Sequence, residues 1–450
     1  MEVSTDPRDA RSKEEIIAEL EKLATEPGFI YSFCTLLLEL FLHPHEAADI
    51  DWYKRLSFQE FSFLGGLMIK QKLNLQIPEE KDFKARIDRV HDLFQELHIA
   101  FNMPFWNQMK RTVQKGSSRE EIKSAFKAAF ASAEFMVEPI FYGGCGAYDF
   151  QYVELAKERY RADGNWIKTA QKLEMEKLAE FFFSLKKLQT IKLNSKSDID
   201  TFEKGCQEIL SAFTFNRKEL PEFSDDEVKN FLDCFSSLPG SVNAKLCTPG
   251  QYNALDSHPI IRLEDDLFFL PIAYNLAQSI YESPYYWLQR DPKYASIAAD
   301  HRGTSTADLT YRMLVGVFGR SNVYKNVGVL KKKGEILTDI DVLAVGGNKA
   351  VVVQAKSKKL TELSRLGNEK ELQSDFKAAV QEAYEQGLIS RKAVLEKNVS
   401  LVDEKGDPIK LDEAIDDVYV LCVTADHYPA LTIQVDAYLK KAQADLLCPT

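Results

Sequence analysis

Two pairs of polar residues interrupt neighbouring apolar runs in the C-terminal third of the chain. Asp339 and Asp341 lie two positions apart in one run, and Gln354 and Lys356 lie two positions apart in the next. Because successive side chains of a β-strand point to opposite faces, the members of each pair share a face if the runs are strands. The segment 346–349 between the runs, Gly-Gly-Asn-Lys, favours a tight hairpin turn. This turn predicts that Asp341 lies opposite the strand end that carries Gln354 and Lys356.

The predicted group holds a carboxylate, an amide oxygen and an ammonium, which together suit the hydrolysis of phosphodiester bonds. Mg²⁺ prefers oxygen ligands, so Asp341 is expected to be the anionic ligand and Gln354 a neutral one. The metal would activate a bound water and neutralise charge on the phosphate. Lys356 would stabilise the charge that develops on the phosphate, or orient the attacking water. We therefore predict Asp341, Gln354 and Lys356 as catalytic residues, with Mg²⁺ or Mn²⁺ as the cofactor.

Each of these residues also has a structural interpretation. Asp341 fits the end of a strand, although a carboxylate within Ile-Asp-Val-Leu is costly to bury without a partner. Gln354 fits a core amide whose hydrogen bonds are satisfied. Asp339 fits either an extra metal ligand or a residue that only flanks the site.

The elements that must position these residues form an α/β pattern. Helices are predicted at 304–318 and 369–386, and strands at 322–330, 336–345, 350–355 and 417–424. Gly319 and Gly387 are expected to end the two helices, because glycine tolerates the backbone conformation found just past a helix end. The expected order is therefore helix, three strands, helix and strand.

This order, combined with the motif, resembles a known family. Asp341, twelve intervening residues and Gln354-Ala355-Lys356 resemble the motif of the PD-(D/E)XK nuclease superfamily, and most closely its Mrr-like branch, in which a QxK motif is common. The resemblance covers residues 301–450 and implies a restriction-endonuclease-like α-β-β-β-α-β core. It also implies an endonuclease that cleaves DNA, with a role in antiviral defence against foreign DNA in bacteria.

The resemblance implies further site residues and shows where this chain departs from the family. Members carry a Glu on the first helix that faces the metal, and Asp308 occupies that region here. They also place a Gln on the second helix, for which Gln381 and Gln386 are the candidates. Because Gln354 replaces an acid, Asp339 is expected to restore part of the lost negative charge. The expected metal ligands are therefore Asp341, Gln354, Asp339 and Asp308.

The distribution of charge favours a nucleic-acid partner for this C-terminal domain. The whole chain carries a net charge of -11, but residues 301–450 hold 21 basic and 21 acidic residues, so the excess acidity lies in 1–300. Basic side chains gather around the predicted site and would contact phosphates. The candidates for nucleic-acid binding are Lys331, Lys332, Lys333, Lys358 and Lys359. The lysines 331–333 equally suit a solvated turn, and DNA is the expected substrate with RNA left open.

The rest of the chain is predicted to be mostly helical. Residues 1–240 show helical periodicity, which at Ser12 begins with a capping-box pattern. Residues 241–300 are expected to form a connector, with a β-hairpin that turns at 264–266 and an aromatic-rich helix at 272–288. The helical region is expected to regulate the nuclease, bind a protein partner or self-associate.

Composition excludes several other classes. The seven cysteines are scattered without a CxxC pair, which argues against a disulfide framework or a zinc module. The N-terminus is polar and acidic, unlike a signal peptide, and no apolar run is long enough to span a bilayer, so a cytoplasmic protein without membrane contact is expected. Two alternatives to the enzyme remain: a degenerate nuclease fold that binds nucleic acid or a partner without cutting, and a helical assembly protein.

Overall fold

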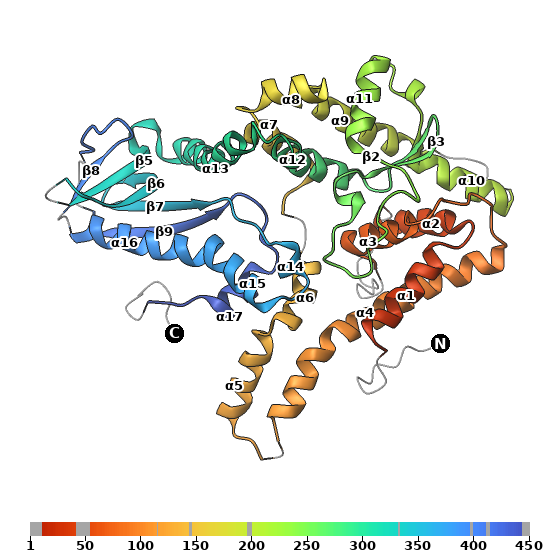
Figure 1. The fold of residues 1–450 in the computed structure, drawn as a ribbon, viewed down its shortest axis with the longest axis horizontal. Coiled ribbons are helices and arrows are strands. Elements are labelled where there is room, and N and C mark those ends of the chain that lie inside the picture. Colours follow the sequence, from red (N-terminus) through yellow and green to blue (C-terminus); the bar gives the residue numbers. More distant parts are fainter. Residues whose placement is uncertain are drawn as a thin grey trace. The chain divides into compact units, whose positions relative to one another are not determined.

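The chain folds into two compact units, residues 1–288 and 289–450. The computed structural model describes residues 11–41, 55–114, 116–143, 146–195, 200–331, 334–396, 399–410 and 415–442 (Figure 1). The region that was expected to be a connector, 241–300, is divided by this boundary. Its hairpin and all but the last residue of its aromatic helix belong to the first unit.

The first unit is built mainly from helices. They are α1 (Lys13–Ala24), α2 (Phe29–Phe41), α3 (Phe58–Met68), α4 (Glu80–Thr112), α5 (Arg119–Phe130), α6 (Ala133–Phe141), α7 (Asp149–Arg159), α8 (Gly164–Gln171), α9 (Met175–Leu193), α10 (Phe202–Phe213), α11 (Asp225–Phe235) and α12 (Ala273–Gln289), with short 3-10 turns at Arg217–Glu219 and Ala254–Asp256. The capping box predicted at Ser12 is present, since the Ser12 side chain accepts the Glu15 N–H and the Glu15 side chain accepts the Ser12 N–H. These bonds satisfy amide groups that have no partner inside the helix.

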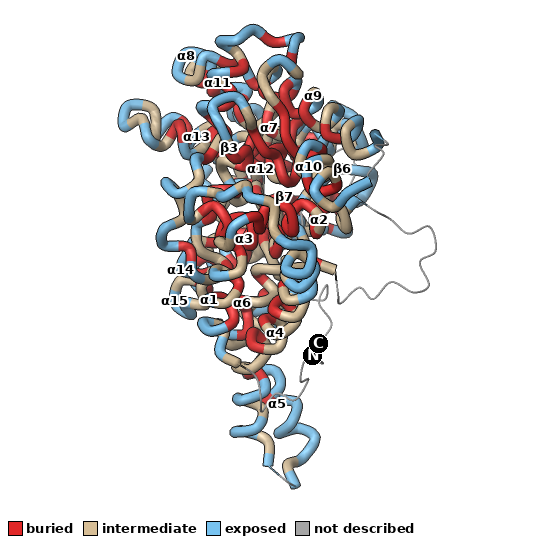
Figure 2. Tube along the Cα trace, turned by 90° about the vertical axis from the view of Figure 1, so that its right-hand side faces the viewer, coloured by how far each residue is buried: buried red, intermediate tan, exposed pale blue. Residues whose placement is uncertain are grey.

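A small sheet joins the helices of this unit. Its strands are β1 (Thr214–Phe215), β2 (Ser236–Ser237), β3 (Ile260–Glu264) and β4 (Leu267–Phe269), in the order β1-β4-β3-β2. The antiparallel pair β3–β4 is the predicted hairpin. Phenylalanines dominate the core, and Figure 2 contrasts the buried stretches of α2 and α9 with α5, most of which is exposed. Within the described part of the chain, no helix has the length and apolarity needed to cross a membrane.

The second unit is a mixed α/β domain. Its helices are α13 (Ala295–Phe318), α14 (Glu362–Arg365), α15 (Glu369–Phe376), α16 (Glu382–Glu396) and α17 (Leu431–Tyr438), with a 3-10 turn at Arg320–Asn322 and a π-helical turn at Lys377–Gln381. Its strands are β5 (Val323–Lys331), β6 (Ile336–Gly346), β7 (Lys349–Lys356), β8 (Val399–Val402) and β9 (Asp417–Thr424). The broad prediction of a helical N-terminal region followed by an α/β domain is therefore confirmed.

The five strands lie in the order β8-β5-β6-β7-β9. All neighbours are antiparallel except β7 and β9, which run parallel. Helices α13 and α16 cover opposite faces of the sheet (Figure 1). On one face, Tyr311, Leu314, Val315 and Phe318 of α13 pack on the apolar residues of β5–β7. On the other, Ala393 and Val394 of α16 belong to the same core as Leu343 and Val352.

Two local predictions in this unit were wrong, and one strand was missed. Helix α13 begins at Ala295, well before the predicted 304, and the edge strand β8 was not predicted. Gly387 lies inside α16 rather than at its end. A Cβ atom at this position would lie 2.2 Å from Val420 Cγ1, so glycine is needed for the close approach of α16 to β9 and not for a helix cap.

Candidate active site

The predicted catalytic residues meet where β6 and β7 separate. The ladder between these strands runs from the Gly346–Lys349 pair to the Val342–Val353 pair. Beyond the last ladder pair, hydrogen bonds made by side chains connect the two strands. The Ala355 N–H donates to Asp341 Oδ2 at 2.7 Å, and Gln354 Nε2 donates to the Asp339 carbonyl oxygen at 2.8 Å. These two bonds hold the Asp341 carboxylate and the Gln354 amide in fixed positions between the diverging strands.

The bonding leaves one oxygen of each residue without a donor. Gln354 is 1% exposed, and its amide orientation is defined because only the NH₂ group can donate to a main-chain carbonyl. Among the residues that the structure describes, no hydrogen bond reaches Gln354 Oε1 or Asp341 Oδ1. Oxygen atoms that no protein donor reaches keep their lone pairs available, so both oxygens are suited to a cation or a bound water.

The electrostatics at Asp341 indicate a shortage of positive charge. Burial raises the pKa of the Asp341 carboxyl, and the nearby Asp339 carboxylate adds to the rise. The Ala355 N–H and the charge of Lys356 oppose it without reversing it. A divalent cation held by oxygen atoms would supply the missing charge, so the donor chemistry fits Mg²⁺ or Mn²⁺.

Lys356 is positioned by the helix that covers this face of the sheet. Its ammonium donates to Gln386 Oε1 of α16 at 2.7 Å. Gly387, the next residue, allows α16 to approach β9 closely enough for Gln386 to reach the strand end. Gln386, one of the two glutamines expected near the site, is therefore beside Lys356.

The other two helix residues expected at the site have partners of their own. Asp308 of α13 forms an ion pair with Lys325, with 2.7 Å between Oδ1 and Nζ, and it is not among the charges that shift the pKa of Asp341. Gln381 bonds instead with the C-terminal segment, because its Oε1 accepts the Lys440 N–H at 2.9 Å. Both side chains are thus occupied in holding neighbouring elements together.

The predicted nucleic-acid-binding lysines differ in their surroundings. Lys332 and Lys333 lie outside the described residues. Lys331 is exposed and lies 3.3 Å from a Glu335 carboxylate oxygen. The ammonium of Lys358 lies 2.7 Å from Asp375, a carboxylate that is 1% exposed, so this lysine neutralises a buried charge. Lys359 is partly buried on the same loop.

The donor set for a metal is sparse. Within the described part of the chain, no three His, Cys, Asp or Glu residues cluster so that they could hold a metal ion together. The residues that fit a cation are Asp341 and Gln354, with the exposed Asp339 beside them. Mg²⁺ suits such a sparse protein donor set, since it usually keeps several waters and binds through one or two carboxylates together with substrate phosphates.

Two groups at the site carried no signal in the sequence. The first is the Ala355 N–H, which anchors Asp341 and belongs to the residue between the two motif positions. The second is Cys422, which the parallel register of β7 and β9 pairs with Gln354. Burial raises the pKa of the Cys422 thiol, although the charge of Lys356 opposes the rise. No periodicity reveals this neighbour, because the register of two strands so far apart in sequence is decided by tertiary packing.

No family model, curated protein or solved structure matches this chain.

Proposed function

We propose that the second unit is a metal-dependent endonuclease that hydrolyses DNA phosphodiester bonds. The observation that carries the proposal is the placement of two oxygen atoms that no described donor reaches, Asp341 Oδ1 and Gln354 Oε1, where β6 and β7 separate, with the charge of Lys356 acting on Asp341. Phosphodiester hydrolysis needs a cation, an activated water and a positive group against the phosphate.

The topology supports assignment to the restriction-endonuclease-like PD-(D/E)XK class, in its Mrr-like form. Helix α13, strands β5 to β7, helix α16 and strand β9 follow one another in the order that the resemblance implies. The edge strand β8 is an addition to this core. Asp341 lies in the middle of β6, and Gln354 and Lys356 lie at the end of β7, where the sheet holds them on rigid backbone.

In this proposal Asp341 and Gln354 hold the metal. The metal would lower the pKa of a bound water and neutralise charge on the phosphate. The Ala355 N–H holds one Asp341 oxygen in place and leaves the other to bind, while the Asp339 main-chain oxygen fixes the Gln354 amide. The Asp339 side chain is exposed beside this pair and would strengthen the site electrostatically.

Lys356 would act on the phosphate. One of its three protons is taken by Gln386, which leaves two for a phosphate oxygen or the attacking water. Gln386 is then a positioning residue. Charged groups that are fixed before the reaction stabilise a developing negative charge without reorganisation.

The test is cleavage by the full-length protein. Plasmid, linear duplex, single-stranded DNA and RNA are incubated with Mg²⁺, Mn²⁺ or EDTA, and Asp341→Asn is compared with Asp417→Asn. Asp417 is an exposed carboxylate of the same sheet that pairs with Lys349, so its variant controls for the loss of one charge. We expect metal-dependent cleavage of DNA that Asp341→Asn removes and Asp417→Asn retains.

Other outcomes distinguish the alternatives. Cleavage that persists in EDTA would refute metal dependence, and cleavage of RNA alone would change the substrate. Binding of DNA without cleavage in either metal would indicate a degenerate fold that serves as a binding module. Assembly through residues 1–288, without binding or cleavage, would favour an assembly protein, and size-exclusion mass measures it.

A further inference from the structure

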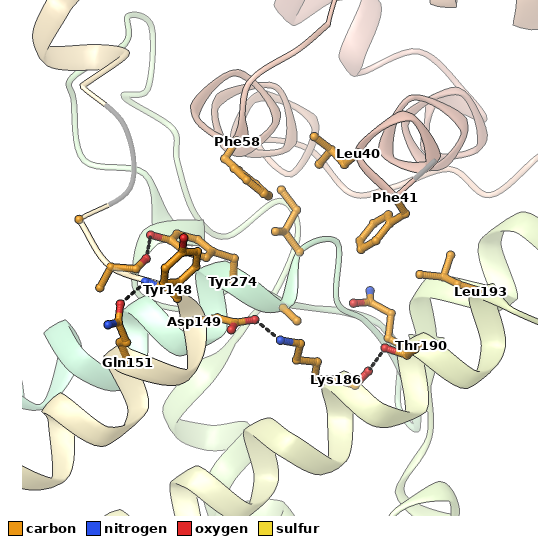
Figure 3. A pocket seen from close by; sticks show the side chains of 15 residues that line it. Leu40, Phe41, Phe58, Tyr148, Asp149, Gln151, Lys186, Thr190, Leu193 and Tyr274 are labelled. Carbon is orange, nitrogen blue, oxygen red and sulfur yellow. Dashed lines mark hydrogen bonds and ion pairs between the residues drawn. The ribbon is translucent and has the colours of Figure 1, made fainter. Parts of the chain in front are cut away.

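The helical unit contains a cleft that the proposed nuclease does not use. It has a volume of about 680 Å³ and opens between α2 and α3 on one side and α7 and α9 on the other. Figure 3 shows Leu40, Phe41 and Phe58 facing Lys186 and Asp149 across the space. Small-molecule sites in proteins typically have volumes of roughly 300 to 1,000 Å³, so the cleft is of the size that a drug-like molecule fills.

Apolar side chains form most of the wall and remain partly in water. Phe41 is 41% exposed, Phe58 is 37% exposed, and Tyr148 at the rim is 71% exposed. Phe58 stacks on Tyr274, with 5.4 Å between the ring centroids, so two aromatic rings lie together in this part of the wall. Exposed aromatic groups that gather around a concavity are typical of ligand sites, since a ligand would remove their apolar surface from water.

An ion pair lies at the floor of the cleft and sets the charge that a ligand would meet there. Lys186 of α9 pairs with Asp149, the first residue of α7. The Lys186 side chain is 44% exposed, whereas that of Asp149 is 19% exposed, so the accessible charge is the positive one. Asp149 is also held by the Phe150 N–H, which donates to its Oδ1 at 2.7 Å. The carboxylate is therefore anchored to the helix start, and the ammonium still has protons to offer to a ligand.

We propose that this cleft binds a small amphipathic monoanion. Its ring-bearing or branched apolar body would lie against Phe58, Tyr274 and Leu193, and its carboxylate or sulfonate head would lie at Lys186. The aliphatic stem of Lys186 adds to the apolar wall while its charged end faces the head group. The site is independent of the proposed nuclease chemistry, because all of its residues belong to the first unit.

Binding is tested on the full-length protein with two fluorescent probes. Anilinonaphthalene sulfonate carries an aromatic body and one negative charge, and N-phenylnaphthylamine has a similar body without the charge. Thr190→Phe places a ring in the cleft. The matched control is Thr169→Phe, because both are exposed helical threonines whose Oγ1 donates to the carbonyl four residues earlier, at 2.8 Å in each case.

The expected result has three parts. The anionic probe binds with a stoichiometry of one, and Thr190→Phe weakens it by about tenfold or more, or roughly 1.4 kcal/mol, while Thr169→Phe leaves it unchanged. Lys186→Met weakens the anionic probe and spares the neutral one. Asp149→Asn tightens the anionic probe, because it removes the carboxylate that competes for Lys186.

Several results would overturn the proposal. They are the absence of saturable binding, equal affinity in Thr190→Phe and the wild type, and equal weakening of both probes in Lys186→Met. A melting curve on each preparation confirms that every variant is folded, since the anionic probe also binds partly unfolded chains. Because DNA cleavage is assayed separately, failure of this proposal leaves the nuclease proposal unaffected.

Discussion

Replacing Gly387 by alanine tests how closely α16 approaches β9. The added Cβ would lie 2.2 Å from Val420 Cγ1 and 3.4 Å from Val420 Cβ, so the helix or the strand must move. Overpacking of this kind costs about 1–3 kcal/mol, and the better helix propensity of alanine offsets about 1 kcal/mol of it. We expect Gly387→Ala to destabilise the second unit by about 0–2 kcal/mol and to weaken the contact between Gln386 and Lys356.

The decisive comparison repeats the Gly387→Ala substitution after the methyl groups of Val420 have been removed. In a Val420→Ala background the clashing atom is absent, so Gly387→Ala should become neutral or stabilising by up to about 1 kcal/mol. The double-mutant cycle should therefore give a coupling energy of about 1–3 kcal/mol, within the range measured for contacting residues. This outcome depends only on the packing of α16 and not on any activity.

Calorimetry of the full chain measures these effects, because about 1 kcal/mol moves the Tm of a unit of this size by roughly 2–4 °C. All four tryptophans lie within residues 1–288, so tryptophan fluorescence follows the first unit alone and assigns the calorimetric transitions. If Gly387→Ala has the same effect with and without the valine, the close approach is refuted.

Three further predictions concern the site and the helical unit. Gln354→Glu should lower the Mg²⁺ concentration needed for half-maximal cleavage, and it should lower the Tm in EDTA because it replaces the amide donor by an anion. Gln354→Ala should abolish cleavage while the fold stays intact. Normal cleavage by the alanine variant would exclude Gln354 as a metal ligand. Lys356→Ala should reduce cleavage by about 10²- to 10³-fold while DNA binding in a gel shift persists, and Lys356→Arg should also fail, whereas near wild-type rates would make Lys356 a simple strand-end charge. Burial lowers the pKa of His98, but its hydrogen bond to Glu138 and the nearby carboxylates raise it to a net value above the ordinary one. The contribution of His98 to stability is thus fully present below about pH 6.5 and is lost as the pH rises through the raised pKa. The Tm difference between the wild type and His98→Gln should therefore shrink as the pH rises. A difference that grows with pH would contradict the ion pair.

Local patterns in the sequence predicted the parts of the fold that depend on neighbouring residues. The alternation in β6 and β7 and the turn at 346–349 predicted the hairpin whose ladder ends at the Val342–Val353 pair, next to Asp341 and Gln354, because strand period and turn length together set the register of a hairpin. The capping box at Ser12 and the hairpin at 260–269 follow from equally local chemistry. These predictions needed no knowledge of distant contacts.

Tertiary packing decided everything that joins distant segments. Glycine at position 387 looks locally like a helix end, but the neighbouring Val420 makes it an interior contact. Asp308 and Lys358 are predicted site residues, and the elements that supply their ion-pair partners, Lys325 and Asp375, are decided by packing within the second unit.

Tertiary packing also explains why two features, the position of Cys422 and the cleft at Lys186, could not be predicted from the sequence. Cys422 lies beside Gln354 only because β9 adds to the sheet parallel to β7, after a long excursion of the chain. The cleft at Lys186 gathers residues from 40 to 274 and has no counterpart in any short motif. Periodicity records which face a residue takes within its own element, whereas the partner across an interface depends on how whole elements pack.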